Sequence, residues 1–94
     1  MDGVICTEEK TFSRSLAVPL PGAVESLLDF KRLGHTIVIF TARSWNEYEM
    51  TEDWLNKYAV PFDRLICGKP IGDLVIDDRA IAFTNWKEVK DKVK

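Results

Sequence analysis

Hydrophobic positions along the chain fall into short strand-like runs separated by helix-like stripes. Residues 36–41, Thr-Ile-Val-Ile-Phe-Thr, form a continuous β-branched and aromatic run, which is typical of a strand buried on both faces of a parallel sheet. Residues 65–66 and 74–76 are shorter apolar runs of the same kind. Residues 1–6 are apolar apart from one Asp-Gly pair, and they indicate the end of a strand that runs into a loop.

Helix signals lie between these runs. The Pro-Leu-Pro-Gly sequence of residues 19–22 opens a first helix, because Pro is tolerated in the first turn, and Gly34 is its natural C′ residue. Ser44 and Glu47 have the spacing of a capping box, in which each side chain pairs with an open N–H group of the first turn. This second helix is expected to run to about Tyr58.

A last helix is expected over about residues 85–93, capped by Thr84 and rich in Lys near its C-terminus, where cations suit the helix dipole. The order strand, helix, strand, helix, strand, strand, helix predicts a parallel sheet with right-handed crossovers. We therefore expect an α/β fold with three layers, in which helices cover both faces of a parallel sheet. Residues 1–94 are expected to form a single domain.

Composition narrows the possible partners. The net charge is −2 and the pI is about 5.3, which disfavours a surface that coats nucleic acid but is compatible with a small anionic substrate. Cys6 and Cys67 are too few for a disulfide framework or a zinc cage, and we expect reduced thiols in a cytoplasmic protein. No apolar run approaches the ~18 residues of a membrane span, and no signal peptide is evident.

Polar features share one topological property, since each follows the end of an expected strand. In open α/β sheets, ligands bind at the carboxyl ends of the strands. The fold should therefore bring these features together, although they are spread along the chain. In chain order they are Asp2-Gly3, Thr41-Ala42-Arg43, Gly68-Lys69-Pro70 and Asp77-Asp78.

The chemistry of these residue types is complementary. The adjacent carboxylates of Asp77 and Asp78 repel each other unless a cation neutralises them, and hard oxygen ligands suit Mg²⁺. Thr41 offers a hydroxyl, and the backbone N–H groups that follow are a natural seat for phosphate. Lys69 adds a positive charge for phosphoryl oxygens. Asp2-Gly3, Thr41 and Lys69-Pro70 are each more often structural when they occur alone, whereas Asp77-Asp78 after a buried strand is as often functional as structural. The joint occurrence of all four favours a phosphate and Mg²⁺ site.

These four features resemble the four motifs of the haloacid dehalogenase (HAD) superfamily of phosphohydrolases. The resemblance covers the whole chain and is greatest to small, capless proteins of the kind linked to capsule biosynthesis or sugar-phosphate metabolism. It implies a Rossmann-like, HAD-like core without a cap domain. It also implies Mg²⁺-dependent hydrolysis of a phosphate monoester, either a sugar phosphate or a nucleotide-type phosphate, through an aspartyl-phosphate. Phosphate ends of a nucleic acid are a less favoured substrate.

The roles of the family's motif residues carry over only to the positions of this chain that match those motifs. Asp2 matches the general acid/base, whose backbone carbonyl also binds Mg²⁺. Thr41 matches the phosphate-binding residue, and the Ala and Arg that follow it are expected to touch phosphate or substrate. Lys69 matches the cation that steadies the nucleophile and the phosphoryl group. Asp77 matches a direct metal ligand, with Asp78 as a supporting carboxylate.

One departure from the family pattern bears on activity. The nucleophilic Asp of the family would fall one place before Met1, and most of the first strand would be missing with it. We therefore expect an N-terminally truncated phosphatase. The alternative is a catalytically inactive module that binds phosphate or a partner. A phospho-accepting receiver domain is disfavoured, because receivers carry their acidic pair near the N-terminus.

Other positions receive secondary roles. The polar loop over residues 7–15, with Lys10 and Arg14, is the candidate specificity flap. Trp45 is expected to pack and to border the pocket, whereas His35 lies at the wrong end of a strand for catalysis. A site without a cap either takes a bulky substrate or is closed by a neighbouring subunit in a homo-oligomer.

Overall fold

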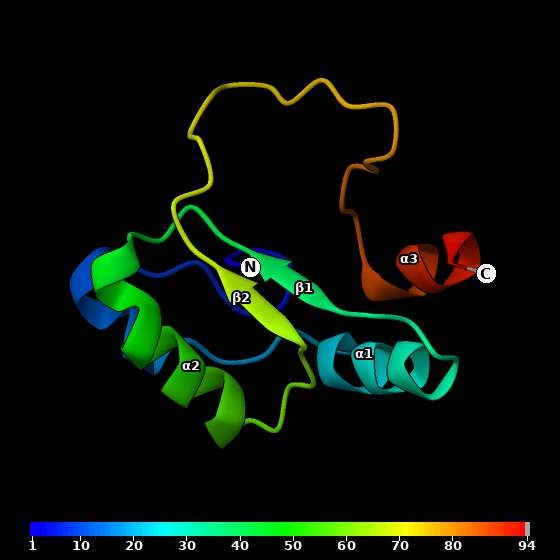
Figure 1. Ribbon diagram of the computed structural model, residues 1–94, viewed down its shortest axis with the longest axis horizontal. Coiled ribbons are helices and arrows are strands. Elements are labelled where there is room, and N and C mark those ends of the chain that lie inside the picture. Colours follow the sequence, from blue (N-terminus) through cyan, green and yellow to red (C-terminus); the bar gives the residue numbers. More distant parts are fainter. Residues whose placement is uncertain (94) are drawn as a thin grey trace.

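Two short parallel strands, β1 (Val38–Phe40) and β2 (Arg64–Ile66), pair with Ile39 opposite Leu65 (Figure 1). The computed structural model describes residues 1–93, apart from the side chains of Thr11 and Phe12. A crossover through the 3-10 helix η2 and helix α2 joins the strands, as a parallel pair requires. The helices of the described chain are η1 (Thr11–Leu16), α1 (Ala23–Arg32), η2 (Trp45–Glu47), α2 (Tyr48–Lys57) and α3 (Trp86–Lys92).

Helix boundaries largely follow the sequence signals. Helix α1 begins directly after Gly22, and Gly34 lies just beyond its end with φ +91, a left-handed conformation that favours glycine. The capping box of Ser44 and Glu47 is present, so the predicted start of the second helix is confirmed. These boundaries were predictable because each is determined locally, by the left-handed glycine that follows α1 and by the side-chain to backbone hydrogen bonds of the capping box.

The cap of the last helix differs from the prediction by one residue. The side-chain oxygen of Asn85 accepts a hydrogen bond from the Glu88 N–H at 2.9 Å, whereas the Thr84 hydroxyl donates to the Glu88 carboxylate. Both Asn and Thr are good N-cap residues, so the pattern alone did not discriminate between them.

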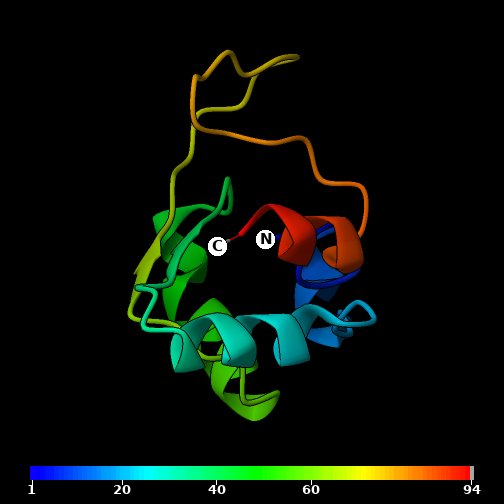
Figure 2. The same cartoon turned by 90° about the vertical axis from the view of Figure 1, so that its right-hand side faces the viewer.

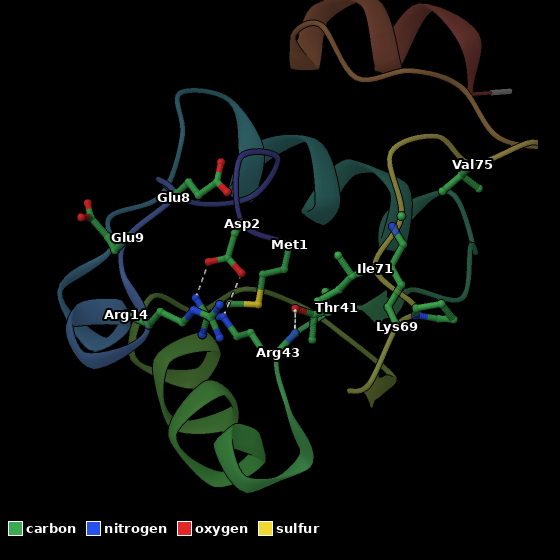
Figure 3. A pocket seen from close by; sticks show the side chains of 13 residues that line it. Met1, Asp2, Glu8, Glu9, Arg14, Thr41, Arg43, Lys69, Ile71 and Val75 are labelled. Carbon is green, nitrogen blue, oxygen red and sulfur yellow. Dashed lines mark hydrogen bonds and ion pairs between the residues drawn. The ribbon is translucent and has the colours of Figure 1, made fainter.

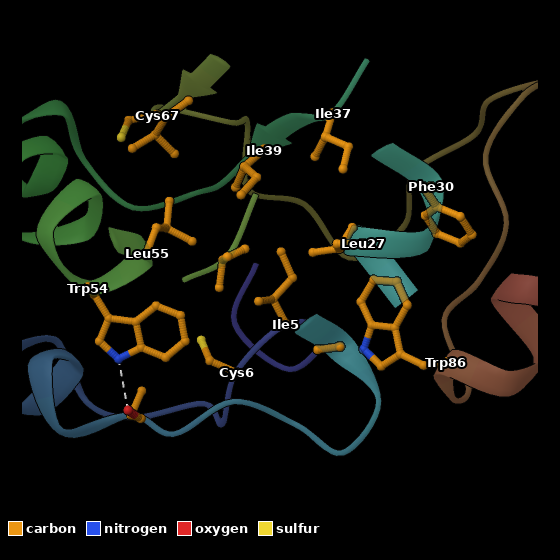
Figure 4. Close-up of a cluster of buried hydrophobic side chains, with 14 residues drawn as sticks. Ile5, Cys6, Leu27, Phe30, Ile37, Ile39, Trp54, Leu55, Cys67 and Trp86 are labelled. Carbon is orange, nitrogen blue, oxygen red and sulfur yellow. Dashed lines mark hydrogen bonds between the residues drawn. The ribbon is translucent and has the colours of Figure 1, made fainter. Parts of the chain in front are cut away.

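The hydrophobic core lies on one side of the sheet (Figure 4). Ile39 and Leu65 face it and are buried, and side chains of α1 and α2 pack there with the N-terminal turn. Val38 and Phe40 point to the other side, and each is 48% exposed. The predicted burial of this strand on both faces is therefore wrong, because among residues 1–93 no helix covers its second face. The structure shows an α/β fold with a two-stranded parallel sheet.

The predicted strand over residues 74–76 is also wrong. Leu74, Val75 and Ile76 are 76%, 66% and 96% exposed and belong to a long loop that extends away from the other elements (Figure 2). Strand residues are stabilised by pairing and by packing on neighbours, and no described strand pairs with this segment.

Residues 1–6 form a turn rather than a strand of the sheet. The Met1 carbonyl accepts hydrogen bonds from the N–H groups of Val4 and Ile5, and isolated bridges join Cys6 to Asp2 and to Pro19. The predicted strand end is therefore not part of the sheet in the described chain. None of the helices within residues 1–93 has the length and apolar character needed to cross a membrane.

Candidate functional site

A cavity of about 540 Å³ lies beyond the carboxyl ends of β1 and β2 (Figure 3). The polar turns that follow these two strands both contribute to its wall, together with the N-terminal turn and the loop after it. Five of the predicted site residues line it, namely Asp2, Thr41, Ala42, Arg43 and Lys69. Thr41, Ala42, Arg43 and Lys69 follow strand ends as expected, whereas Asp2 reaches the cavity from the N-terminal turn.

Backbone hydrogen bonds tie the two post-strand turns together. The Thr41 N–H donates to the Ile66 carbonyl at 3.0 Å, which continues the strand pairing. The Lys69 N–H then donates to the Thr41 carbonyl at 2.9 Å. The Thr41 hydroxyl accepts the Arg43 N–H at 3.2 Å and retains its own proton as a donor. Thr41 and Lys69 are thus held side by side at the cavity.

The Arg43 side chain is completely buried and bonds to Asp2. Its Nε and Nη2 atoms donate to the two carboxylate oxygens of Asp2 at 3.0 and 2.7 Å, and Nη1 donates to the Thr51 hydroxyl at 3.0 Å. The guanidinium was expected to touch phosphate or substrate, but in this structure it joins the N-terminal turn to α2. Thr51 was not recognised from the sequence, because a Thr inside a helix carries no signal of such a partner.

The ion pair between Asp2 and Arg43 and the burial of the site shift the pKa values of Asp2 and Cys6. Burial acts to raise the pKa of the Asp2 carboxyl, but the hydrogen bonds and charge of Arg43 outweigh it, and the pKa lies below its ordinary value. Burial, assisted by the nearby Asp2 charge, raises the pKa of the Cys6 thiol to about 11. Cys6 is therefore a poor nucleophile, as expected from the sequence. Cys6 and Cys67 are both free and buried.

Lys69 follows a glycine that the packing requires. Gly68 has φ +78, and a Cβ atom there would lie 2.9 Å from Nε1 of Trp45. Trp45 in turn stacks on Tyr48 with 5.8 Å between ring centroids. The Lys69 Nζ lies 5.7 Å from the ring centroid of Phe40, within cation–π range. Trp45 thus lies against the turn that carries Lys69, but it is 58% exposed and does not line the cavity, so the expectation that it borders the pocket is wrong.

Asp77 and Asp78 lie outside the cavity. Both are exposed, and an Asp77 carboxylate oxygen accepts the Arg79 N–H at 2.7 Å. Residues 1–93 contain no group of three acidic, His or Cys side chains that could hold a metal ion. The predicted Mg²⁺ ligand set of Asp2, Asp77 and Asp78 is therefore not brought together, because the segment before Asp77 does not form the strand that would place it. In this arrangement the residues do not fit Mg²⁺.

The segment after the N-terminal turn supplies three residues of the cavity wall, and the predicted loop over residues 7–15 is wrong from Thr11 onwards, where η1 begins. Arg14, one of the two predicted flap cations, lines the cavity, and its Nη1 atom lies 2.5 and 2.7 Å from the carboxylate oxygens of Glu47. Glu8 and Glu9 also line the cavity and were not singled out from the sequence. Their only signal was a pair of acidic residues in a loop close to Asp2.

These features define an α/β protein with a polar cavity at the carboxyl ends of parallel strands. The structure superposes with a TM-score of 0.77 on the crystal structure of an MCSG target from Vibrio cholerae, with 28% sequence identity. The match covers 99% of this chain and 85% of that one. No family model matches the chain, and no curated protein matches it. The similarity supports the α/β fold.

Proposed function

We propose that this chain is a phosphate monoester hydrolase of the HAD type, acting on a small phosphorylated substrate such as a sugar phosphate. Through the resemblance the proposal also includes a three-layer, Rossmann-like HAD fold without a cap domain, although among residues 1–93 no helix covers the second face of the sheet. The observation that carries it is the single cavity at the strand ends, which contains the residues matching three of the four motifs: Asp2, Thr41 and Lys69. The two free, buried thiols fit the cytoplasmic location that belongs to the same proposal.

The geometry supports phosphate binding most directly. Lys69 supplies a positive charge at the cavity wall, and the adjacent Thr41 hydroxyl supplies a hydrogen-bond donor. Such groups stabilise the charge on phosphoryl oxygens when they are held in place before the reaction. The backbone hydrogen bond between the Lys69 N–H and the Thr41 carbonyl provides this fixed placement.

Mg²⁺ enters the proposal through the resemblance alone. Its expected ligands Asp77 and Asp78 lie outside the cavity, and Asp2 is paired with Arg43. We assign no step to the metal for this reason. Dependence of turnover on Mg²⁺ is a separate part of the test.

The test is hydrolysis of p-nitrophenyl phosphate with Mg²⁺, measured on the 94-residue chain and on a version extended at its N-terminus by an apolar strand and the Asp that the family pattern places before Met1. The extended form is expected to be the active one, and the substitutions below are made in it. Turnover is expected to fall by about 100-fold in Lys69→Ala, the size of effect seen when one transition-state donor is removed. Lys87→Ala, on the exposed surface of α3, is the matched control and should leave turnover unchanged. EDTA is added in a separate arm: loss of turnover supports the metal dependence that the resemblance implies, and activity that persists in EDTA contradicts it.

A second candidate is a module that binds phosphate without turnover. It is favoured by the Asp2–Arg43 pair, because a carboxyl with a lowered pKa is a poor general acid. Calorimetric titration with inorganic phosphate separates the two candidates. Binding that Lys69→Ala weakens, together with no measurable hydrolysis, would favour the module. Absence of phosphate binding would contradict both.

A further inference from the structure

Half of the charged side chains that line the cavity are already neutralised. Arg43 is paired with Asp2, and Arg14 is paired with Glu47. In both pairs the cation donates to a carboxylate at hydrogen-bond distance, and all four side chains are at most 22% exposed. These groups bind each other, so they contribute little net charge towards a ligand in the cavity.

Three charged side chains of the wall remain. Lys69, Glu8 and Glu9 take part in none of the ion pairs among residues 1–93. Glu9 accepts one hydrogen bond, from the Thr7 hydroxyl at 3.2 Å. Figure 3 shows the two glutamates at one end of the cavity and Lys69 at the other, with Asp2 between them. Among its unpaired side chains the wall therefore presents one cation and two carboxylates at opposite ends, and the α-amino group of Met1, whose pKa is lowered by burial, also lies at the wall.

This charge arrangement restricts the ligand. A phosphate group beside Lys69 brings up to two negative charges into a cavity that already holds two unpaired carboxylates. Like charges that face each other across a partly enclosed site disfavour binding, whereas an opposite charge beside each end favours it. A ligand that is anionic at one end and cationic at the other satisfies both ends of the wall.

We propose that the cavity takes a phosphate monoester whose alcohol part carries a protonated amine, with the phosphate at Lys69 and the ammonium at Glu8 and Glu9. This inference rests on the proposed function, since it assumes that the Lys69 end binds phosphate. It assigns the substrate class to aminated sugar or amino-alcohol phosphates. It also makes Glu8 and Glu9 the residues that determine specificity, and nucleotides with several phosphates are disfavoured.

The experiment compares glucosamine 6-phosphate with glucose 6-phosphate, which share a phosphate and a ring and differ in the amine. Both are titrated calorimetrically into the 94-residue chain in EDTA at a pH of about 6.5, below the ~7.7 typical of an α-amino group. Glucosamine 6-phosphate is expected to bind about five- to tenfold more tightly, as two partly exposed ion pairs would give.

Two double variants that lose the same charge test whether Glu8 and Glu9 cause the preference for glucosamine 6-phosphate. The double variant Glu8→Gln/Glu9→Gln should lose the preference, and Glu25→Gln/Glu49→Gln should keep it. Glu25 and Glu49 are exposed on α1 and α2 and do not line the cavity. Because all four side chains that change are exposed, none of these variants removes a buried contact.

Inorganic phosphate is titrated in parallel, so that failure of this inference and failure of the proposed function are distinguished. Equal affinity for the two sugar phosphates, with phosphate itself bound, overturns the inference and leaves the proposed function standing. A preference that survives Glu8→Gln/Glu9→Gln also overturns it. If glucose 6-phosphate reaches equal affinity when Mg²⁺ is added, and only with both glutamates present, the carboxylates hold a metal ion and the amine assignment is wrong.

Discussion

At the scale of single residues, the Arg43–Asp2 ion pair accounts for most of the site's geometry. The two residues are far apart in the chain, yet three guanidinium nitrogens of Arg43 are bonded to Asp2 and Thr51. A buried ion pair is weak evidence for stability, because desolvation of both charges offsets their attraction. Removing one partner is different, since the remaining charge then stays buried without compensation.

Substitution of Arg43 by Gln is therefore expected to destabilise the protein by about 3 kcal/mol, because Asp2 and Thr51 lose their partner. The midpoint of urea denaturation measures the change. Arg32→Gln is the matched control: Arg32 pairs with Asp29 but is 73% exposed, so its loss should cost less than about 1 kcal/mol. Equal midpoints for the two variants would show that the buried pair contributes no more than a surface pair.

Acid should weaken the same pair. The pKa of Asp2 is lowered in the folded state, so its contribution to stability is present above the unfolded pKa and is lost as the pH falls through the folded pKa. The thermal midpoint of the wild type should therefore fall more steeply below about pH 4 than that of Asp2→Asn, which cannot titrate. Parallel curves for the two proteins would contradict a lowered pKa.

At the scale of elements, local sequence signals determined the helix boundaries, whereas a contact with a side chain distant in the sequence explains one glycine. The helix starts at Gly22 and at Ser44 and the end at Gly34 were predictable, because each is determined within one turn of backbone. The glycine at position 68, between β2 and Lys69, makes a close contact that the sequence did not show. Gly68 has φ +78, and its missing Cβ leaves room for the indole of Trp45.

Gly68→Ala is therefore expected to destabilise the protein by about 1–3 kcal/mol, through both the positive φ and the contact with the indole. Thermal denaturation gives the measurement. In Gly72→Ala the new Cβ would meet nothing closer than 3.9 Å, and this control should be close to neutral. Adding Trp45→Ala to Gly68→Ala should restore the part of the stability that is lost through the contact with the indole. No recovery would mean that the positive φ alone causes the loss of stability.

At the scale of the whole molecule, an uncovered apolar surface is the main anomaly. The loop over residues 71–82 is exposed throughout and contains Leu74 and Ile76 at 76% and 96% exposure. Val38 and Phe40 expose the second face of the sheet. Apolar surface of this extent is typical of regions that associate with another surface.

Self-association should therefore depend on this loop. Leu74→Ser/Ile76→Ser is expected to lower the association measured by sedimentation velocity across a concentration series, without lowering the thermal midpoint, because both side chains are already exposed. Leu33→Ser, at a 68% exposed position after α1, is the control for a single apolar side chain and should leave association unchanged. Unchanged association in the double variant would contradict a role for the loop.

Prediction from sequence succeeded for features that depend on neighbouring residues in the chain or on the type and order of the elements. Both strands of the sheet follow from hydrophobic runs, the capping box follows from its residue spacing, and the placement of Thr41 and Lys69 follows from the rule that ligands bind at strand ends. Asp2 reaches the cavity from a turn instead, where its carboxylate pairs with Arg43.

Distant contacts determined the rest. Residues 74–76 have a strand composition, but a strand requires a partner edge, and in the described chain the segment has none, so Asp77 stays outside the cavity. Arg43 follows β1 as expected, yet its direction depends on Asp2 and Thr51, which neutralise its buried charge. Composition and periodicity specify which elements form, whereas strand pairing and charge pairing specify which of their side chains reach the site.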